Sequence, residues 1–362
     1  MLKYSLGLDI SSKEIHCCLS TIDSSQKVSI KGSRTIANTF KGFKDLEDWV
    51  IRHRKQKEIP LVICMEATGV YYENCAMYLS KAGFPVSVLL PNYAKRYLQA
   101  SGVKSKNDKI DAQGLAQMGA EKSLELWEPI SEFYYSLRLL TREIENLQEQ
   151  KTVVINQMHA LQHAMHQNKV VNKTLLNRLK LIKKQLEDLE MAIQEHIDSN
   201  KEIAEKVRKI CKIKGVGIRT VATLIAETNG FKLFKNARQL VSFAGYDIVE
   251  NQSGSHHGRT RISKKGNSHI RRILHLPAFG VVRWKVGPFE DLYERTYAKH
   301  GIKMKSYVAV QKKLLVITYS LWKNDQEYDG KYKNKYNKQE EKELSIQEMS
   351  IVGEFQQRLL SK

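Results

Sequence analysis

Four carboxylates in the first third of the chain have the types and spacing that phosphoryl-transfer chemistry requires. Asp9 lies at the end of the apolar run YSLGLDI and Glu66 ends the run LVICME, while Asp108 and Asp111 lie in KNDKIDAQGLAQMGA, which predicts the first turns of a helix. A spacing of three places those last two on one helical face. Clustered carboxylates repel one another unless cations neutralise them. Mg²⁺ prefers such hard oxygen ligands, and two ions could clamp the attacking and leaving oxygens of a phosphodiester.

Any one of these acids alone fits a helix cap or a solvated charge. Their shared context, at two strand ends and one helix start, favours a metal site. Three strands in a meander followed by alternating helix and strand predict a mixed sheet with helical cover, in the order of a ribonuclease-H-like fold. The expected strands are 4–10, 14–21, 27–34, 61–66 and 84–91, with helices at 40–55 and 70–83 between them.

A helical middle region follows Pro129, which disfavours helix at the residue before it. Apolar residues then recur at heptad spacing in two segments, joined by HQNKVVNKT, which predicts a coiled-coil hairpin or an oligomerisation stalk. Lys151 interrupts the first seam. Three histidines share one face of the first helix, where they fit a polar flank better than a metal site. They are His159, His163 and His166.

The turn Gly215-Val216-Gly217 resembles the second half of a helix-hairpin-helix, and an ordinary helix–helix turn fits it equally well. A stretch rich in Ser, Gly and basic residues comes later. Ser253, flanked by Gly254, could be an exposed nucleophile or a loop residue. The density of cations beside it predicts a phosphate-binding surface. These cations are Arg259, Arg261, Lys264, Lys265, Arg271 and Arg272.

The composition favours a nucleic-acid partner. Lys and Arg number 59 against 39 Asp and Glu, which gives a net charge of +20 and points to a polyanion. No apolar stretch approaches the roughly 20 residues that span a bilayer, and the N-terminus lacks the layout of a signal peptide. Five scattered cysteines form no CxxC pair, which argues against structural zinc and disulfides. We therefore expect a cytoplasmic protein without a membrane partner.

The motifs GLDIS, CMEATGVYYE and KSKNDKIDA resemble the DEDD motif of one family of insertion-sequence transposases, now understood as bridge-RNA-guided DNA recombinases. The stretch FAGYDIVENQSGSHHGRTRISKKGNSHIRRIL resembles that family's second conserved domain. The resemblance covers roughly residues 3–325. It implies a RuvC-like DEDD domain at 1–125, a coiled-coil hairpin at 130–205 and a mostly α-helical serine transposase domain at 206–322. Residues 323–362 predict a basic, flexible tail.

The same resemblance implies a mechanism. The four acids would bind Mg²⁺, for which Mn²⁺ could substitute, and Ser253 would form a covalent phosphoserine link with DNA. Ser255 is one step removed from the motif and is the rival nucleophile; His256 and His257 could shuttle a proton or contact DNA. The implied partners are donor and target DNA, an element-encoded noncoding guide RNA, and further copies of the chain. The site would combine acids and serine from different protomers of a dimer, with a tetramer in the synaptic complex, acting on the bacterial nucleoid.

Rival functions use the same residues differently. A metal-dependent endonuclease or junction resolvase would use the four acids with water as the nucleophile, and it would leave no protein–DNA adduct. A sugar-kinase-like ATPase would require a second Asp-containing phosphate loop, which the sequence lacks. A non-catalytic architectural protein would gain nothing from acids that face a polyanion.

Overall fold

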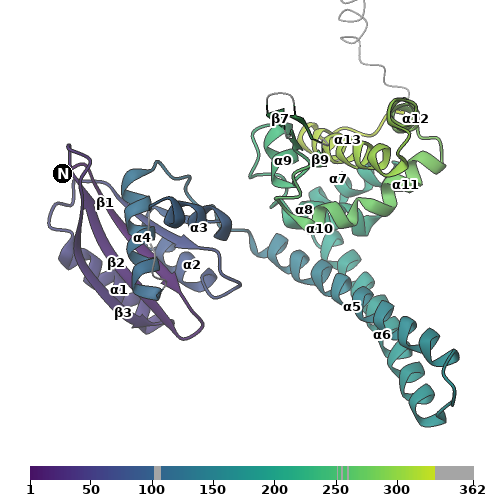
Figure 1. Cartoon of the computed structure of the whole chain (residues 1–362), viewed down its shortest axis with the longest axis horizontal. Helices are drawn as coiled ribbons and strands as arrows, with labels where there is room; N and C mark the ends of the chain where they lie inside the picture. The colour runs from purple at the N-terminus through teal and green to yellow at the C-terminus, as the bar shows by residue number, and fades with distance from the viewer. Residues whose placement is uncertain (102–106, 251, 254–255, 259–260, 331–362) are drawn as a thin grey trace, which may run out of the picture. The chain divides into compact units, whose positions relative to one another are not determined.

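The protein is described by a computed structural model that covers residues 1–101, 107–250, 252–253, 256–258 and 261–330. The chain forms two compact units, Met1–Pro129 and Ile130–Lys362, and each is described by itself (Figure 1). The first unit is an α/β fold with one mixed sheet, and the second is mostly helical. The helical middle region was predicted to begin after Pro129, and the boundary between the units lies there.

The sheet of the first unit has the order β3-β2-β1-β4-β5. Its first three strands are antiparallel: β1 (Lys3–Ile10), β2 (Glu14–Ile22) and β3 (Val28–Ala37). On the other side of β1, the strands β4 (Leu61–Glu66) and β5 (Val86–Leu89) run parallel to it. The meander followed by parallel strands is the arrangement that the sequence predicted, with bounds that differ by a few residues.

Helices cover both faces of this sheet. One apolar layer joins alternate residues of the central strands to α1 (Phe40–His53) and α2 (Glu73–Lys81). The opposite face carries α3 (Pro91–Ala100) and α4 (Asp108–Glu121), where Cys18 packs against Ala112 and Ala116. A strand presents successive side chains to opposite faces, so the near-continuous apolar runs of β1 and β2 are what a sheet covered on both sides needs.

The helix α4 lies directly against β1 because both contain very small residues at the contact. A Cβ atom on Gly7 would lie 2.1 Å from the carbonyl oxygen of Ala112 and 2.2 Å from the amide nitrogen of Ala116. On the same helix, a Cβ atom on Gly119 would lie 2.3 Å from the Ser5 hydroxyl. Only glycine at these positions allows so close an approach. The side chain of Asn107 accepts a hydrogen bond from the amide of Ile110 and so fixes where α4 begins.

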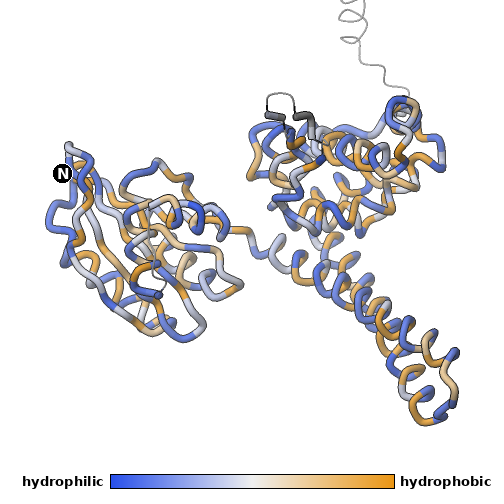
Figure 2. The backbone as a smooth tube through the Cα atoms, in the orientation of Figure 1, coloured by the Kyte–Doolittle hydropathy of each residue, from blue (hydrophilic) through white to orange (hydrophobic). Residues whose placement is uncertain are grey.

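The second unit opens with a helical hairpin, α5 (Glu132–Gln162) and α6 (Lys169–Asp198). Side chains of the predicted seam are buried between the two helices, among them Ile144, Leu147, Val154, Ile182 and Leu186. Figure 2 shows hydrophobic and hydrophilic stretches alternating along both helices. The heptad pattern therefore forms a coiled-coil hairpin within one chain. The rings of His159 and His163 lie 4.9 Å apart.

The rest of the second unit is a helical layer that the start of α5 packs against. Its long helices are α7 (Lys201–Cys211), α8 (Ile218–Glu227), α12 (Gly287–His300) and α13 (Lys303–Asn324). The turn between α7 and α8 packs against the backbone of α11, where Gly215 faces Gly280 and neither residue has a Cβ atom. Gly215 also has a φ of +100°, which favours glycine. The shorter helices are α9 (Ala237–Phe243), α10 (Ser268–Ile273) and α11 (His275–Arg283).

Two short two-stranded pairings connect α9 to α10. They consist of β6 (Ile248–Val249) with β9 (Arg261–Ile262), and β7 (Gln252–Ser253) with β8 (His256–His257). Both pairings are antiparallel. We call the described residues between 244 and 267 (244–250, 252–253, 256–258 and 261–267) the serine ribbon, since β6 and β7 lead away from α9 and β8 and β9 lead back to α10.

The cysteines and the C-terminal helix were also subjects of sequence predictions. Cys17, Cys18 and Cys64 are buried free thiols. No helix in the described part of the chain is long and apolar enough to cross a membrane. The helix α13 continues to Asn324, into the start of the predicted tail, and Asp325 forms an ion pair with Lys209. The remainder of that tail, 331–362, lies outside the described residues.

Candidate active site

The fold brings the four predicted acids to one end of the sheet. Asp9 lies near the end of β1 and Glu66 is the last residue of β4; these neighbouring strands run parallel with Leu8 opposite Met65. Parallel strands end at the same edge of a sheet, so both acids lie at that edge. The small-residue contact between β1 and α4 brings the first turn of α4, with Asp108 and Asp111, to the same region.

Electrostatics show that these carboxylates share one region. The pKa of the Asp9 carboxyl is raised to about 6, and burial is the largest cause. Three neighbouring charges raise it in the same direction: Asp111, then Asp108, then Glu66. Like charges disfavour ionisation of a carboxyl, and each must therefore be near enough to Asp9 to act on it.

His16 is a member of this region that the sequence analysis missed. It pairs with Asp9 across β1 and β2, and its charge lowers the pKa of Asp9. Its Nε2 lies 3.5 Å from Oδ2 of Asp108, and its Nδ1 lies 3.0 Å from the hydroxyl of Thr35 on β3. The ring is thus held between a hydroxyl and a carboxylate. Only the register of β1 against β2 places His16 beside Asp9, and the sequence does not show that register.

The donor chemistry of the site fits a divalent cation. All four side chains offer carboxylate oxygens, the ligands that Mg²⁺ and Mn²⁺ prefer. Among the described residues, no three His, Cys, Asp or Glu side chains lie close enough together to hold an ion as they stand. The candidate site is therefore located by the strand and helix ends that carry the acids and by the raised pKa of Asp9. The carboxylate side chains themselves can rotate toward an ion.

Ser253 lies in the second unit, on the serine ribbon. Its side chain is exposed, and it pairs with His256 in the last described step of the ribbon. Ser255 lies outside the described residues, as do the side chains of His256 and His257. An exposed hydroxyl at this place is accessible to a macromolecular substrate.

The predicted basic residues fall into two groups. Arg261, Lys264 and Lys265 are exposed on or beside the returning strand of the ribbon, and Arg259 lies outside the described residues. Arg271 instead donates to three backbone carbonyls, and Arg272 forms ion pairs with Glu145 and Glu149 on α5. Density of charge alone did not distinguish the exposed cations from those with partners inside the protein.

A pocket of about 650 Å³ lies beside these ion pairs, bounded by α5, the 215–217 turn, α8 and α10. Its polar lining includes Glu145, Glu149, Arg219, His269 and Arg272. It contains neither Ser253 nor the acids of the first unit.

Two family models match successive parts of the chain. A family model described as "Transposase", of the DEDD class, matches residues 6–167, and the "Transposase IS116/IS110/IS902 family" model matches residues 207–294. The chain is therefore a DNA transposase of the DEDD class, an enzyme of DNA recombination. The second match is to the IS116/IS110/IS902 family model, so two separate parts of the chain each match a model of transposases.

Curated relatives match much of the chain. The "Pilin gene-inverting protein" of Moraxella lacunata is 26% identical over 330 residues, which is 91% of this chain and 98% of the relative. The "Transposase for insertion sequence element IS1111A" of Coxiella burnetii is 23% identical and covers 53% of this chain and 58% of its own. A solved RuvC of Thermus thermophilus with a Holliday junction substrate covers 33% of this chain and 93% of its own. At 12% identity and a TM-score of 0.26, that likeness carries no argument.

Proposed function

We propose that this transposase cuts and exchanges DNA strands with Ser253 as its nucleophile and with divalent cations held by Asp9, Glu66, Asp108 and Asp111. The observation that carries the proposal is the convergence of four carboxylates at one sheet edge, expressed in the raised pKa of Asp9. The strand order is that of a ribonuclease-H-like fold, so we assign the first unit as RuvC-like. Mg²⁺ is the proposed ion, with Mn²⁺ as a substitute.

The bound ions would polarise the scissile phosphate and neutralise the leaving oxygen. The chain's own contribution is to hold four oxygen donors at fixed strand and helix ends and to present a hydroxyl. The Ser253 Oγ forms a bond to phosphorus and gives its proton to solvent. The DNA P–O bond breaks, and the leaving oxygen takes up a proton from solvent to become a free hydroxyl end. The energy of the broken phosphodiester stays in the phosphoserine ester, so that strands can be rejoined without ATP.

The partners in the proposal follow from charge and from the family. A net charge of +20 suits donor DNA, target DNA and a structured guide RNA. We propose that the guide is a noncoding RNA encoded by the element, and that the protein acts in the bacterial cytoplasm as a homo-oligomer in which one protomer supplies acids and another the serine. Dimers would assemble into a tetramer in the synaptic complex.

A water-using endonuclease is the second candidate. The observation that favours it is that all four acids come from the first unit, which needs no protein nucleophile to hold a metal-activated water.

Capture of a covalent adduct separates the two. Wild-type protein is stalled on plasmid DNA that carries the ends of its element, with the RNA that co-purifies, and is then denatured in SDS. The serine mechanism gives DNA that remains bound to protein until protease is added, and Ser253→Ala abolishes this product while Ser255→Ala retains it. Cleavage at the wild-type rate by Ser253→Ala would establish the endonuclease instead. An adduct lost only in Ser255→Ala would keep the mechanism and move the nucleophile by two residues.

A further inference from the structure

The serine ribbon is closed at its base by a ladder of backbone hydrogen bonds. The amide of Asn267 donates to the carbonyl of Phe243 at 2.7 Å, and the amide of Lys264 donates to the carbonyl of Gly245 at 3.1 Å. The two sides approach so closely that a Cβ atom on Gly266 would lie 2.6 Å from the amide nitrogen of Gly245. The base of the ribbon is thus a fixed point, and the ribbon extends from it toward Ser253.

Arg271 reinforces this base from within. One guanidinium nitrogen, Nη1, lies 2.7 Å from the carbonyl oxygen of Ala244, 3.1 Å from that of Gly266 and 3.2 Å from that of Asn267. The same side chain therefore bonds both sides of the ribbon base. A cation shared by three carbonyl oxygens satisfies acceptors that an open turn would leave to water.

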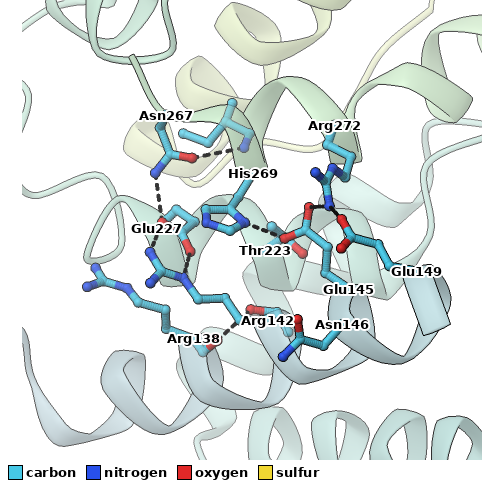
Figure 3. Close-up of polar contacts among 12 residues, drawn as sticks. Arg138, Arg142, Glu145, Asn146, Glu149, Thr223, Glu227, Asn267, His269 and Arg272 are labelled. Atoms are coloured by element: carbon cyan, nitrogen blue, oxygen red, sulfur yellow. Dashed lines mark hydrogen bonds and ion pairs between the residues drawn. The ribbon is translucent and has the colours of Figure 1, made fainter. Parts of the chain in front are cut away.

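Asn267 connects the ribbon base to the rest of the unit. Its Oδ1 accepts a hydrogen bond from the amide of Ile270 and so caps α10, while its Nδ2 donates to Oε2 of Glu227 at 2.7 Å. Glu227, the last residue of α8, is only 2% exposed. It also accepts two hydrogen bonds from Arg142 on α5, at 2.8 and 3.0 Å (Figure 3).

Two further side chains of α10 fasten that helix to α5. His269 bonds to Glu145, and Arg272 lies 2.7 Å from the same carboxylate while also pairing with Glu149 (Figure 3). The helix that follows the ribbon is therefore joined to α5 at several successive turns. Of these contacts, only the one through Glu227 reaches the ribbon base itself.

Burying the Glu227 carboxylate is costly, and burial alone would raise its pKa. The hydrogen bonds and charge of Arg142 and the hydrogen bond from Asn267 outweigh burial, so that the pKa of Glu227 is lowered and the group remains charged. A well-packed apolar residue could fill such a place without loss of stability. What the carboxylate supplies instead is directional bonding to two other elements at once.

We propose that Glu227, through Asn267, is a positioning residue that sets the direction in which the ribbon presents Ser253. This role rests on the proposed function of Ser253 as the nucleophile. The Glu227–Asn267 bond ties the returning end of the ribbon base to α5 and α8. Its loss frees that end from these two helices, while Tyr246 keeps its hydrogen bond to Gln311 on α13. Nucleophilic attack depends steeply on the alignment of the reacting atoms.

The substitution Asn267→Ser tests this role with little disturbance. Serine is as good an N-cap as asparagine, but it is too short to reach Glu227, which keeps its bonds to Arg142. The matched control is Asn236→Ser, the same change at the N-cap of α9, where the asparagine accepts from the amide of Gln239. Both variants are compared with the wild type in rate of adduct formation at saturating plasmid DNA, in DNA affinity and in melting temperature.

We expect Asn267→Ser to slow adduct formation by about 10-fold or more, with the DNA affinity of Asn236→Ser. Its melting temperature should be somewhat lower than that of the control, because a hydrogen bond to a buried carboxylate is lost, so adduct rates are compared well below both melting temperatures. The amides of residues 243–249 and 261–267 should exchange with deuterium faster in Asn267→Ser alone. An adduct rate equal to that of the control would overturn the positioning role and leave the serine mechanism intact. A wild type that forms no adduct overturns both. If Asn267→Ser does not fold, Glu227→Asp replaces it, since the shorter carboxylate cannot span Arg142 and Asn267, and the same two outcomes decide.

Discussion

The pKa of Asp9 depends on all the other acids of the candidate site. Asp9 lies near the end of β1, whose other residues are mostly buried. Three other carboxylates raise its pKa further. A cation would remove that repulsion and return the carboxyl to its ionised form. The sequence indicated these acids because each one interrupts an apolar run or begins a helix.

Burial of Asp9, together with its repulsion by the other acids, predicts an unusual pH dependence for the stability of metal-free protein. The folded-state pKa of Asp9, about 6, lies above its ordinary 3.8, so its contribution to stability is present below about pH 4 and is lost as the pH rises through about 6. Metal-free Asp9→Asn should therefore melt at a higher temperature than wild type near pH 7.5 and at the same temperature near pH 4. Thermal unfolding in EDTA measures this, with the exposed Asp48→Asn on α1 as the control. Added Mg²⁺ should stabilise wild type and not Asp9→Asn; parallel pH profiles would contradict the shared region.

Glu227 behaves in the opposite way. Its pKa is lowered from its ordinary 4.5, so it stabilises the folded state above about that pH and less as the pH falls further. Arg142→Leu leaves the carboxylate buried without its main partner and should cost about 3 kcal/mol in free energy of unfolding near neutral pH. Urea unfolding at neutral pH and near pH 4 measures the loss, which should shrink in acid as Glu227 takes up a proton. A loss that does not change with pH would mean that packing, and not charge, is responsible.

At the scale of elements, α4 carries two of the four acids, Asp108 and Asp111, and Gly7 allows α4 to lie against β1. The contact of Gly7 with the helix backbone leaves no room for a Cβ atom. This feature was not predicted, because a glycine within an apolar run gives no sign of which helix will cross it.

Gly7→Ala should move α4 away from β1 and separate Asp108 and Asp111 from Asp9. We expect a loss of about 1–3 kcal/mol from overpacking, and a loss of Mg²⁺ binding and strand cleavage beyond what stability explains. Calorimetric titration of Mg²⁺ into folded protein measures the effect. Gly217→Ala is the control, since a Cβ atom there has open space; normal Mg²⁺ affinity in Gly7→Ala would show that the acids are positioned in another way.

At the scale of the whole molecule, the dominant property is the charge of +20. Binding of a polyanion releases counterions, so affinity should fall steeply with salt. Arg261→Ala and Lys265→Ala should each weaken binding to unrelated DNA sequences alike and reduce the slope of log affinity against log salt by about one. Filter binding over a salt series tests this, with Lys44→Ala on α1 as a control. Unchanged slopes in both variants would place the DNA on another surface.

Sequence reasoning reached the sheet, the hairpin and the acid positions because these depend on periodicity and on where apolar runs stop. It missed His16 and Glu227 because their roles depend on partners brought together only by strand register and helix packing. For the same reason it grouped Arg271 and Arg272 with the exposed cations, although one binds carbonyl oxygens and the other carboxylates. Charge density in a sequence does not identify the partner of each charge.

The helix α5 has a mechanical consequence. Its 31 residues contain no glycine or proline, and it extends without interruption for about 45 Å at 1.5 Å per residue. Sharp kinks occur almost only at proline, glycine or inserted groups, so α5 is a stiff rod. It bonds Glu227 through Arg142 in its N-terminal half and ends at the hairpin loop. A load applied at the hairpin loop is carried along this rod as a torque on the ribbon base, some tens of ångströms away.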